Sequence, residues 1–239
     1  MASDVIESEA LIKVWAWFET HRKQVAWGAA IVVVAAFIGW FIVYHQDQKQ
    51  IASGEALSNI VIPQVSNPNA RPAPDAYLRV ARDYPDTSAG ERALLLAAAS
   101  MFDEGKYTDA RAQFDRFRRE HHDSTLLGEA LLGMAACLDA EGKSSEALTA
   151  YRDLVDHHPN DLVILPQAKF ALGRLYEAAG QPSLARDFFE QVLRTDPYGS
   201  TSLGSEAGIR LEELKLKYPS LTPSTPMPTN GPTFNIQKQ

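Results

Sequence analysis

Residues 25–44 form a stretch of twenty residues without a charged side chain. At about 1.5 Å rise per residue, an α-helix of this length spans roughly 30 Å, the thickness of a bilayer's hydrocarbon core. A helix pairs its backbone N–H and C=O groups internally, which a lone segment in lipid requires. Trp27 lies near one end and Trp40 and Tyr44 near the other, where aromatic rings favour the membrane interfaces. The stretch predicts a transmembrane helix, with a buried core helix as the alternative.

The segment before this stretch, residues 1–24, is too long and too acidic for the start of an ordinary signal peptide. No small-x-small cleavage site follows the apolar run, so an uncleaved anchor is expected. Leu11, Ile12, Trp15 and Phe18 fall on one helical face. They predict a short amphipathic helix along the membrane surface, with a frayed polar tail as the alternative.

Basic residues flank the apolar stretch unequally. Lys13, Arg22 and Lys23 precede it, whereas only Lys49 follows it closely. Because Lys and Arg are enriched on the cytoplasmic side of membrane helices, we expect a cytoplasmic N-terminus. The predicted location is therefore the inner membrane, single-pass, with the large C-terminal part in the periplasm.

Composition limits what the rest of the chain can be. The chain has 239 residues, and without the anchor region and a C-terminal tail about 170 remain, enough for one domain with a proper core. A net charge of −7 argues against nucleic acid as a partner. Cys137, the single cysteine, excludes an intramolecular disulfide and a cysteine-based metal cluster. Abundant alanine and few β-branched residues outside the apolar stretch predict an all-helical domain.

Residues 45–74 are expected to form a juxtamembrane helix followed by a connector. The first sixteen of them can continue the membrane helix outward. Prolines at positions 63, 68, 72 and 74 then predict a loop or polyproline-like connector, because proline lacks an N–H donor and restricts the residue before it.

Residues 75–219 carry an internal repeat. The dipeptides Tyr84-Pro85 and His158-Pro159 are 74 residues apart, twice 37, and the next such dipeptide, Asp196-Pro197, follows after 38. This period is close to the 34 residues of a helix–turn–helix repeat. The segments DEGKYTD, AEGKSSE and AAGQPSL each hold a glycine suited to a helix C-cap. Three units share one spacing of small and large apolar residues: Leu94, Ala98, Met101, Ala110, Phe114 and Phe117; Leu131, Ala135, Leu138, Ala147, Tyr151 and Leu154; and Gly173, Tyr176, Ala185, Phe189 and Val192.

This pattern resembles the tetratricopeptide repeat family. The resemblance covers residues 88–197 as three repeats, with a half-unit at 75–84 before them and a single helix at about 205–218 as a solvating cap. Lys169 departs from the pattern, because the motif prefers an apolar residue there. The expected fold class is all-α: a single transmembrane helix followed by a solenoid of tetratricopeptide-repeat helical hairpins.

A wider resemblance concerns the order of segments. The order of segments resembles that of the ancillary subunit family of the bacterial Sec translocon. In both, an acidic N-terminus with a tryptophan pair, here Trp15 and Trp17, is followed by an anchor, here holding Gly39-Trp40, and then by the repeats. That resemblance implies an inner-membrane protein whose partners are the translocon and extracytoplasmic chaperones. The proline-rich connector and the tail depart from the family pattern.

The chain shows no pattern typical of catalysis. A glycine-rich phosphate loop, a nucleophile elbow and a His-Glu-x-x-His motif are all missing from the sequence. The pairs His121-His122 and His157-His158 are poor chelates, because adjacent helical residues do not face each other; they suit helix C-termini instead. We predict no catalytic residues, no metal and no cofactor, with an undetected hydrolase or metal site as the enzymatic alternative. Cys137 is interpreted as a small buried hydrophobe.

Stacked helix pairs form a superhelix whose first helices line a concave groove. The predicted function is a membrane-anchored adaptor that binds protein partners in this groove, assisting protein translocation, chaperone recruitment or envelope assembly. The alternative is a scaffold that self-associates, possible through the small residues Ala35 and Gly39 of the anchor. By the family resemblance, the groove-facing residues are Arg92, Leu95, Phe102, Glu129, Leu132, Phe170, Arg174 and Glu177.

The tail, residues 220–239, is rich in proline and poor in apolar side chains until its end. It buries too little surface to offset the entropy of ordering, so we expect disorder. The alternative to a disordered tail is that Phe234-Asn235-Ile236 forms a short docking motif.

Overall fold

The structure, a computed structural model, describes residues 2–66, 72–158, 161–196 and 199–219. Over these ranges every regular element is an α-helix, as the sequence predicted. The helices are α1 (Ala2–Ser66), α2 (Pro74–Asp83), α3 (Ser88–Asp103), α4 (Tyr107–Glu120), α5 (Leu127–Ala140), α6 (Ser144–His157), α7 (Ile164–Ala178), α8 (Pro182–Thr195) and α9 (Ser202–Lys217).

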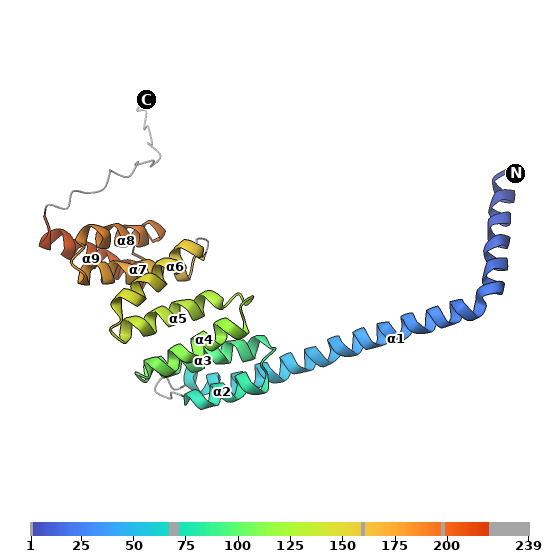
Figure 1. Cartoon of the computed structure of the whole chain (residues 1–239), viewed down its shortest axis with the longest axis horizontal. Coiled ribbons are helices and arrows are strands. Elements are labelled where there is room, and N and C mark those ends of the chain that lie inside the picture. The colour runs from blue at the N-terminus through green and yellow to red at the C-terminus, as the bar shows by residue number, and fades with distance from the viewer. Residues whose placement is uncertain (1, 67–71, 159–160, 197–198, 220–239) are drawn as a thin grey trace, which may run out of the picture.

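Helix α1 extends as a long rod from a stack formed by α2–α9, and it bends near its N-terminal end (Figure 1). Residues 1–24 were predicted to hold a short amphipathic helix; within the described residues this segment is helical and is continuous with the apolar stretch in α1, which begins at Ala2. The portion Thr20–Pro63 is long and apolar enough to cross a membrane by length and composition, and none of its most apolar window is buried.

The last turns of α1 belong to the solenoid. Ala56, Leu57 and Ile60 pack against the core formed with α2 and α3, and Ser53 is fully buried. The side-chain oxygen of Gln50 accepts a hydrogen bond from the backbone N–H of Ser88, at 3.4 Å. Helix α1 contacts both α2 and α3. This is the arrangement of a tetratricopeptide repeat, in which the first helix packs against the second helix of its own repeat and against the first helix of the following repeat. The half-unit predicted at residues 75–84 is therefore completed by the end of the same helix that carries the apolar stretch.

The predicted proline connector requires correction. Pro63 lies inside α1, which continues to Ser66, and Pro74 occupies the first turn of α2, where it is buried. Proline is favoured at the start of a helix because its missing N–H has no partner there. Near the end of α1, the packing of Leu57 and Ile60 holds the backbone helical despite the local effect of Pro63. Pro68 lies outside the described residues.

Three helix hairpins follow, α3/α4, α5/α6 and α7/α8, and their turns share one geometry. Gly105, Gly142 and Gly180 have φ of +75°, +75° and +69°, a conformation that L side chains rarely adopt. Each glycine N–H donates to the carbonyl oxygen three residues back, and the next N–H donates five residues back, at 2.9–3.0 Å. This bonding pattern closes the first helix of each hairpin, so the predicted C-cap role of the three glycines is confirmed.

The core is built from small residues that let helices approach and large residues that fill the space beside them. Ala98, Ala135 and Ala185 are completely buried, as are the rings of Phe117 and Phe189. These are the positions whose regular spacing predicted the repeats. Lys169, the departure from the pattern, is only half-buried.

Helix α9 begins at Ser202, three residues earlier than predicted, because the Thr201 hydroxyl accepts a hydrogen bond from the backbone N–H of Gly204 at 3.0 Å. Its role as a solvating cap is wrong in part: Ile209 is 57% exposed and Leu216 is 81% exposed. Helix α9 occupies the place of a first helix, and no second helix covers its outer face within the described residues. The tail, residues 220–239, lies outside them.

We expect Gly173→Ala to destabilise the fold, although alanine is the better helix former. A Cβ atom at this position would lie 2.6 Å from Cε1 of Phe189, whose ring is fully buried. Overpacking of this kind lowers the free energy of unfolding by about 1–3 kcal/mol. Thermal and denaturant unfolding of the full-length protein in detergent, followed by circular dichroism, measures the change.

Gly208→Ala is the matched control, because a Cβ there would meet only Cδ2 of Leu193 at an ordinary 3.9 Å. This variant should gain about 0.5–1 kcal/mol from helix propensity. Equal stability of the two variants would contradict the close helix contact at Gly173.

Candidate protein-binding groove

A cavity of about 420 Å³ lies along the first helices of three successive repeats, and we name it the first-helix cavity. It exists because short side chains, those of Ala99, Gly133 and Ala136, leave space between helices whose separation is set by larger neighbours. It is lined by Arg92, Leu95, Leu96 and Ala99 of α3, Phe114 of α4, Glu129, Leu132, Gly133 and Ala136 of α5, and Val163, Ile164 and Gln167 at the start of α7.

The cavity has an apolar floor and a partly charged rim. Leu95 is buried, Leu96 and Leu132 are half-buried, and Val163 is 69% exposed at the α7 end. An accessible apolar surface of this kind, bordered by charges, is typical of sites that bind peptide or protein segments.

Ion pairs connect successive first helices on this side of the solenoid. Arg92 Nη1 of α3 lies 3.3 Å from Glu129 Oε1 of α5, and Arg174 Nη2 of α7 lies 2.6 Å from Asp139 Oδ2 of α5. Both arginines are about half exposed, so each pair adds at most about 1 kcal/mol to stability. Their main effect is to leave charged groups of both signs at the surface beside the cavity.

The predicted groove residues divide into two groups. Arg92, Leu95, Glu129 and Leu132 come together in the first-helix cavity. Phe102, Phe170, Arg174 and Glu177 lie outside the lining of that cavity.

Two of the four outside residues have packing roles. The Phe102 ring lies 5.1 Å from the Tyr107 ring, across the α3–α4 turn. Phe170 is buried, with its ring 5.6 Å from that of Phe189. Both positions were assigned to the groove by the family resemblance, whereas in the structure their rings contact Tyr107 of α4 and Phe189 of α8.

Sequence reasoning missed part of the lining. Ala99 lies one helical turn beyond Leu95, a spacing that could have identified it. Val163 and Gln167 gave no such signal, because the start of α7 follows a loop whose length the repeat pattern does not specify. The Asp161 carboxylate defines that start by accepting hydrogen bonds from the N–H groups of Val163 and Ile164, both at 3.0 Å.

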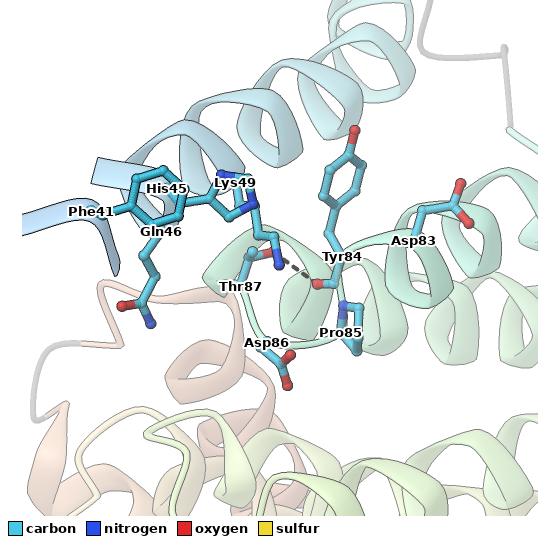
Figure 2. Close-up of a pocket in the computed structure, with 9 residues that line it drawn as sticks. All are labelled: Phe41, His45, Gln46, Lys49, Asp83, Tyr84, Pro85, Asp86 and Thr87. Carbon is cyan, nitrogen blue, oxygen red and sulfur yellow. Dashed lines mark hydrogen bonds between the residues drawn. The ribbon is translucent and has the colours of Figure 1, made fainter. Parts of the chain in front are cut away.

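A second cavity, of about 370 Å³, lies where α1 meets the corner between α2 and α3 (Figure 2). We name it the junction cavity. Nothing in the sequence pattern predicted it, because its two walls are about forty residues apart in the chain. It is lined by Phe41, His45, Gln46 and Lys49 of α1 and by Asp83, Tyr84, Pro85, Asp86 and Thr87 of the corner.

The histidine pairs occupy helix ends, as expected. His121 closes α4; its ring is tilted by 45° against that of Phe117, with ring centroids 5.0 Å apart, and it lies 3.7 Å from the carboxylate of Glu91. His157, in the last turn of α6, lies 3.0 Å from the carboxylate of Asp153. Among the residues that the structure describes, no three His, Cys, Asp or Glu side chains gather in a way that could hold a metal ion.

Comparison with protein families identifies the repeat. Residues 15–215 match the family described as tetratricopeptide repeat-like domain. The chain belongs to this family. The match begins within α1 and includes the apolar stretch together with all three hairpins, so both fall within the one family domain. None of the curated protein sequences compared with the chain matches it.

Solved structures are similar in fold. A tetratricopeptide repeat protein from Parabacteroides merdae aligns with a TM-score of 0.52 at 18% identity, over 71% of this chain and 63% of that one. PcrH from Pseudomonas aeruginosa aligns with a TM-score of 0.47 at 20% identity, over 54% of this chain and 93% of that one. MamA from Desulfovibrio magneticus aligns with a TM-score of 0.45 at 17% identity, over 71% and 94%. The likeness to the Parabacteroides merdae protein supports the repeat fold.

The Cys137 thiol is expected to be unreactive in the folded protein. It is fully buried in α5, and burial raises the pKa of the thiol to about 11. At pH 8 about one thousandth of such thiols would be ionised, and only the thiolate is the nucleophile. Titration with Ellman's reagent should show no rapid reaction until denaturant unfolds the repeats, with an exposed cysteine introduced at Ser145 as a positive control. Fast labelling of the native protein would contradict the burial of Cys137.

Proposed function

We propose that this protein is a membrane-anchored adaptor that binds protein partners through the first-helix cavity. Its single span would cross the bacterial inner membrane with the N-terminus in the cytoplasm and the repeats in the periplasm. The observation that carries the proposal is the continuity of α1: an uncharged segment exposed on all described sides leads directly into the packed core of an interaction solenoid.

The membrane part of the proposal rests on what the apolar stretch would otherwise do in water. Trp27, Val33 and Phe37 are more than 60% exposed, and so are several of their neighbours. An exposed apolar surface running the length of a helix is unfavourable in water but matches hydrocarbon, so burial in a bilayer accounts for it. The excess of basic residues before the stretch supports the proposed orientation.

The interaction part rests on the first-helix cavity and on the family. Tetratricopeptide-type repeats generally serve protein interaction. The partners that fit the proposed location are subunits of the translocation machinery and extracytoplasmic chaperones. A role in translocation, chaperone recruitment or envelope assembly would follow from holding such partners close to the membrane.

Membrane integration has a direct test. Val33→Arg combined with Phe37→Arg places two charges at the centre of the stretch, at about 2.5–3.5 kcal/mol each, and should move the protein out of carbonate-washed membranes. Ile51→Arg with Ile62→Arg is the matched control, since these exposed residues of α1 lie beyond the stretch. Alkaline phosphatase fused after residue 239 should be active. An inactive fusion would refute the proposed orientation, and a wild-type protein that remains soluble would refute the membrane anchor.

Partner binding is tested by Val163→Glu, which introduces a charge at the exposed end of the first-helix cavity. Val163 is 69% exposed, so the fold should tolerate the change, whereas an apolar contact with a partner should weaken about tenfold. Leu184→Glu, on the second helix α8 and outside the cavity lining, is the matched control. Affinity capture of the solubilised full-length protein should recover translocon subunits or extracytoplasmic chaperones with wild type and Leu184→Glu, and fewer with Val163→Glu. Recovery of cytoplasmic proteins alone would contradict the proposal.

Self-association is a second candidate, favoured by the open outer face of α9. Ile209 and Leu216 are exposed there beside a hollow that Leu193 and Gly208 also line. In the same capture experiment with two differently tagged copies, this candidate requires that one copy retrieves the other. It also requires that Leu216→Asp abolishes the retrieval while Val163→Glu does not.

A further inference from the structure

The junction cavity has walls that are fixed relative to each other. On one side, the rings of Phe41 and His45 stack nearly parallel, with centroids 6.1 Å apart. On the other side, the Thr87 hydroxyl donates to the Tyr84 carbonyl oxygen at 2.9 Å and tightens the corner between α2 and α3 (Figure 2). Burial of Ser53 and the hydrogen bond from Ser88 to Gln50 join the two sides just beyond the cavity.

The position of this cavity along α1 determines its depth in a membrane. Phe41 lies inside the apolar stretch, about 4.5 Å before its end at Tyr44, and Lys49 lies about 7.5 Å beyond that end. The headgroup layer extends roughly 5–7 Å outward from the hydrocarbon boundary on each side. The cavity therefore spans the step from acyl chains to headgroups, with an aromatic ring at its inner end and charged groups at its outer end.

The charges in the cavity are of both signs and partly unpaired. Within the described residues, neither the Lys49 ammonium nor the Asp86 carboxylate takes part in an ion pair or hydrogen bond. The Asp83 carboxylate is 3.4 Å from Arg82, in an exposed pair. Figure 2 shows Lys49 reaching from α1 toward the corner, while Asp86 projects from the corner itself. A ligand that carries an anion and a cation a few bonds apart would satisfy both groups.

We propose that the junction cavity binds the headgroup of an aminophospholipid such as phosphatidylethanolamine. The Lys49 ammonium pairs with the lipid phosphate, the Asp86 carboxylate accepts hydrogen bonds from the lipid ammonium, and Phe41 contacts the start of an acyl chain. This inference rests on the proposed membrane anchor, because only an inserted α1 brings the cavity to headgroup depth.

The chemistry of the cavity separates this lipid from the common alternatives. Phosphatidylglycerol offers a phosphate to Lys49 but no cation to Asp86, so the Asp86 carboxylate would stay without a partner and would lie close to the lipid's negative charge. Phosphatidylcholine carries a cation, but its quaternary nitrogen has no N–H to donate to a carboxylate. The primary ammonium of phosphatidylethanolamine provides three such donors.

The test uses the full-length protein in detergent, titrated separately with the three lipids, and native mass spectrometry counts the lipids bound. Wild type should bind phosphatidylethanolamine about fivefold more tightly than the other two, the effect of roughly one well-placed charge contact. Lys49→Gln and Asp86→Asn should each remove this preference. Lys23→Gln, before the apolar stretch, and Asp47→Asn, on α1 outside the cavity lining, are the matched controls and should retain it.

Equal binding of the three lipids by wild type would overturn the inference, and so would a preference for phosphatidylethanolamine that survives both cavity variants. Equally tight binding of soluble phosphoethanolamine would also overturn it, because a free small molecule would then be the ligand. Each of these can occur in a protein that stays in carbonate-washed membranes, so the membrane anchor would still stand. A protein that leaves those membranes would refute the anchor and this inference together.

Discussion

The packing of the last turns of α1 into the solenoid core is the contact on which the rest of the molecule depends. Leu57 and Ile60 contribute apolar surface to the same core that Ala98 and Phe117 fill, and Ser53 is buried at that contact. Without this contact, a flexible linker would join the repeats to the apolar stretch. With it, the first helix of the first helix pair and the apolar stretch are parts of one element, and the junction cavity has two fixed walls.

Much of the fold was predictable because the sequence repeats its constraints. Each of the three units has a glycine with positive φ, at position 105, 142 or 180, and alanine at completely buried helix contacts. These shared constraints favour the same helix hairpin in all three units. The apolar stretch was equally clear, since twenty uncharged residues have few stable forms in water. What the pattern could not show was the course of the chain around Pro63. Local preference predicts a break there, and long-range packing by Ile60 outweighs it.

The candidate sites were harder to predict than the fold, for a physical reason. Half of the groove residues implied by the family resemblance line the first-helix cavity, because a family pattern marks positions along a helix but not how far each side chain reaches. Phe102 and Phe170 face partner helices because their rings are long enough to cross to them. Val163 and the junction cavity depend on loop lengths and on contacts between distant segments, and a single sequence does not encode those in its periodicity.

The absence of a break in α1 between residue 25 and Ser66 has a mechanical consequence. Membrane helices tilt to match their apolar length to the bilayer, by about 20° on average. A helix joined to its domain by a loose linker would tilt alone, whereas this one would act as a lever and swing the whole solenoid with it. For the membrane anchor and binding groove proposed above, local thinning or thickening of the bilayer would then change the direction in which the first-helix cavity faces.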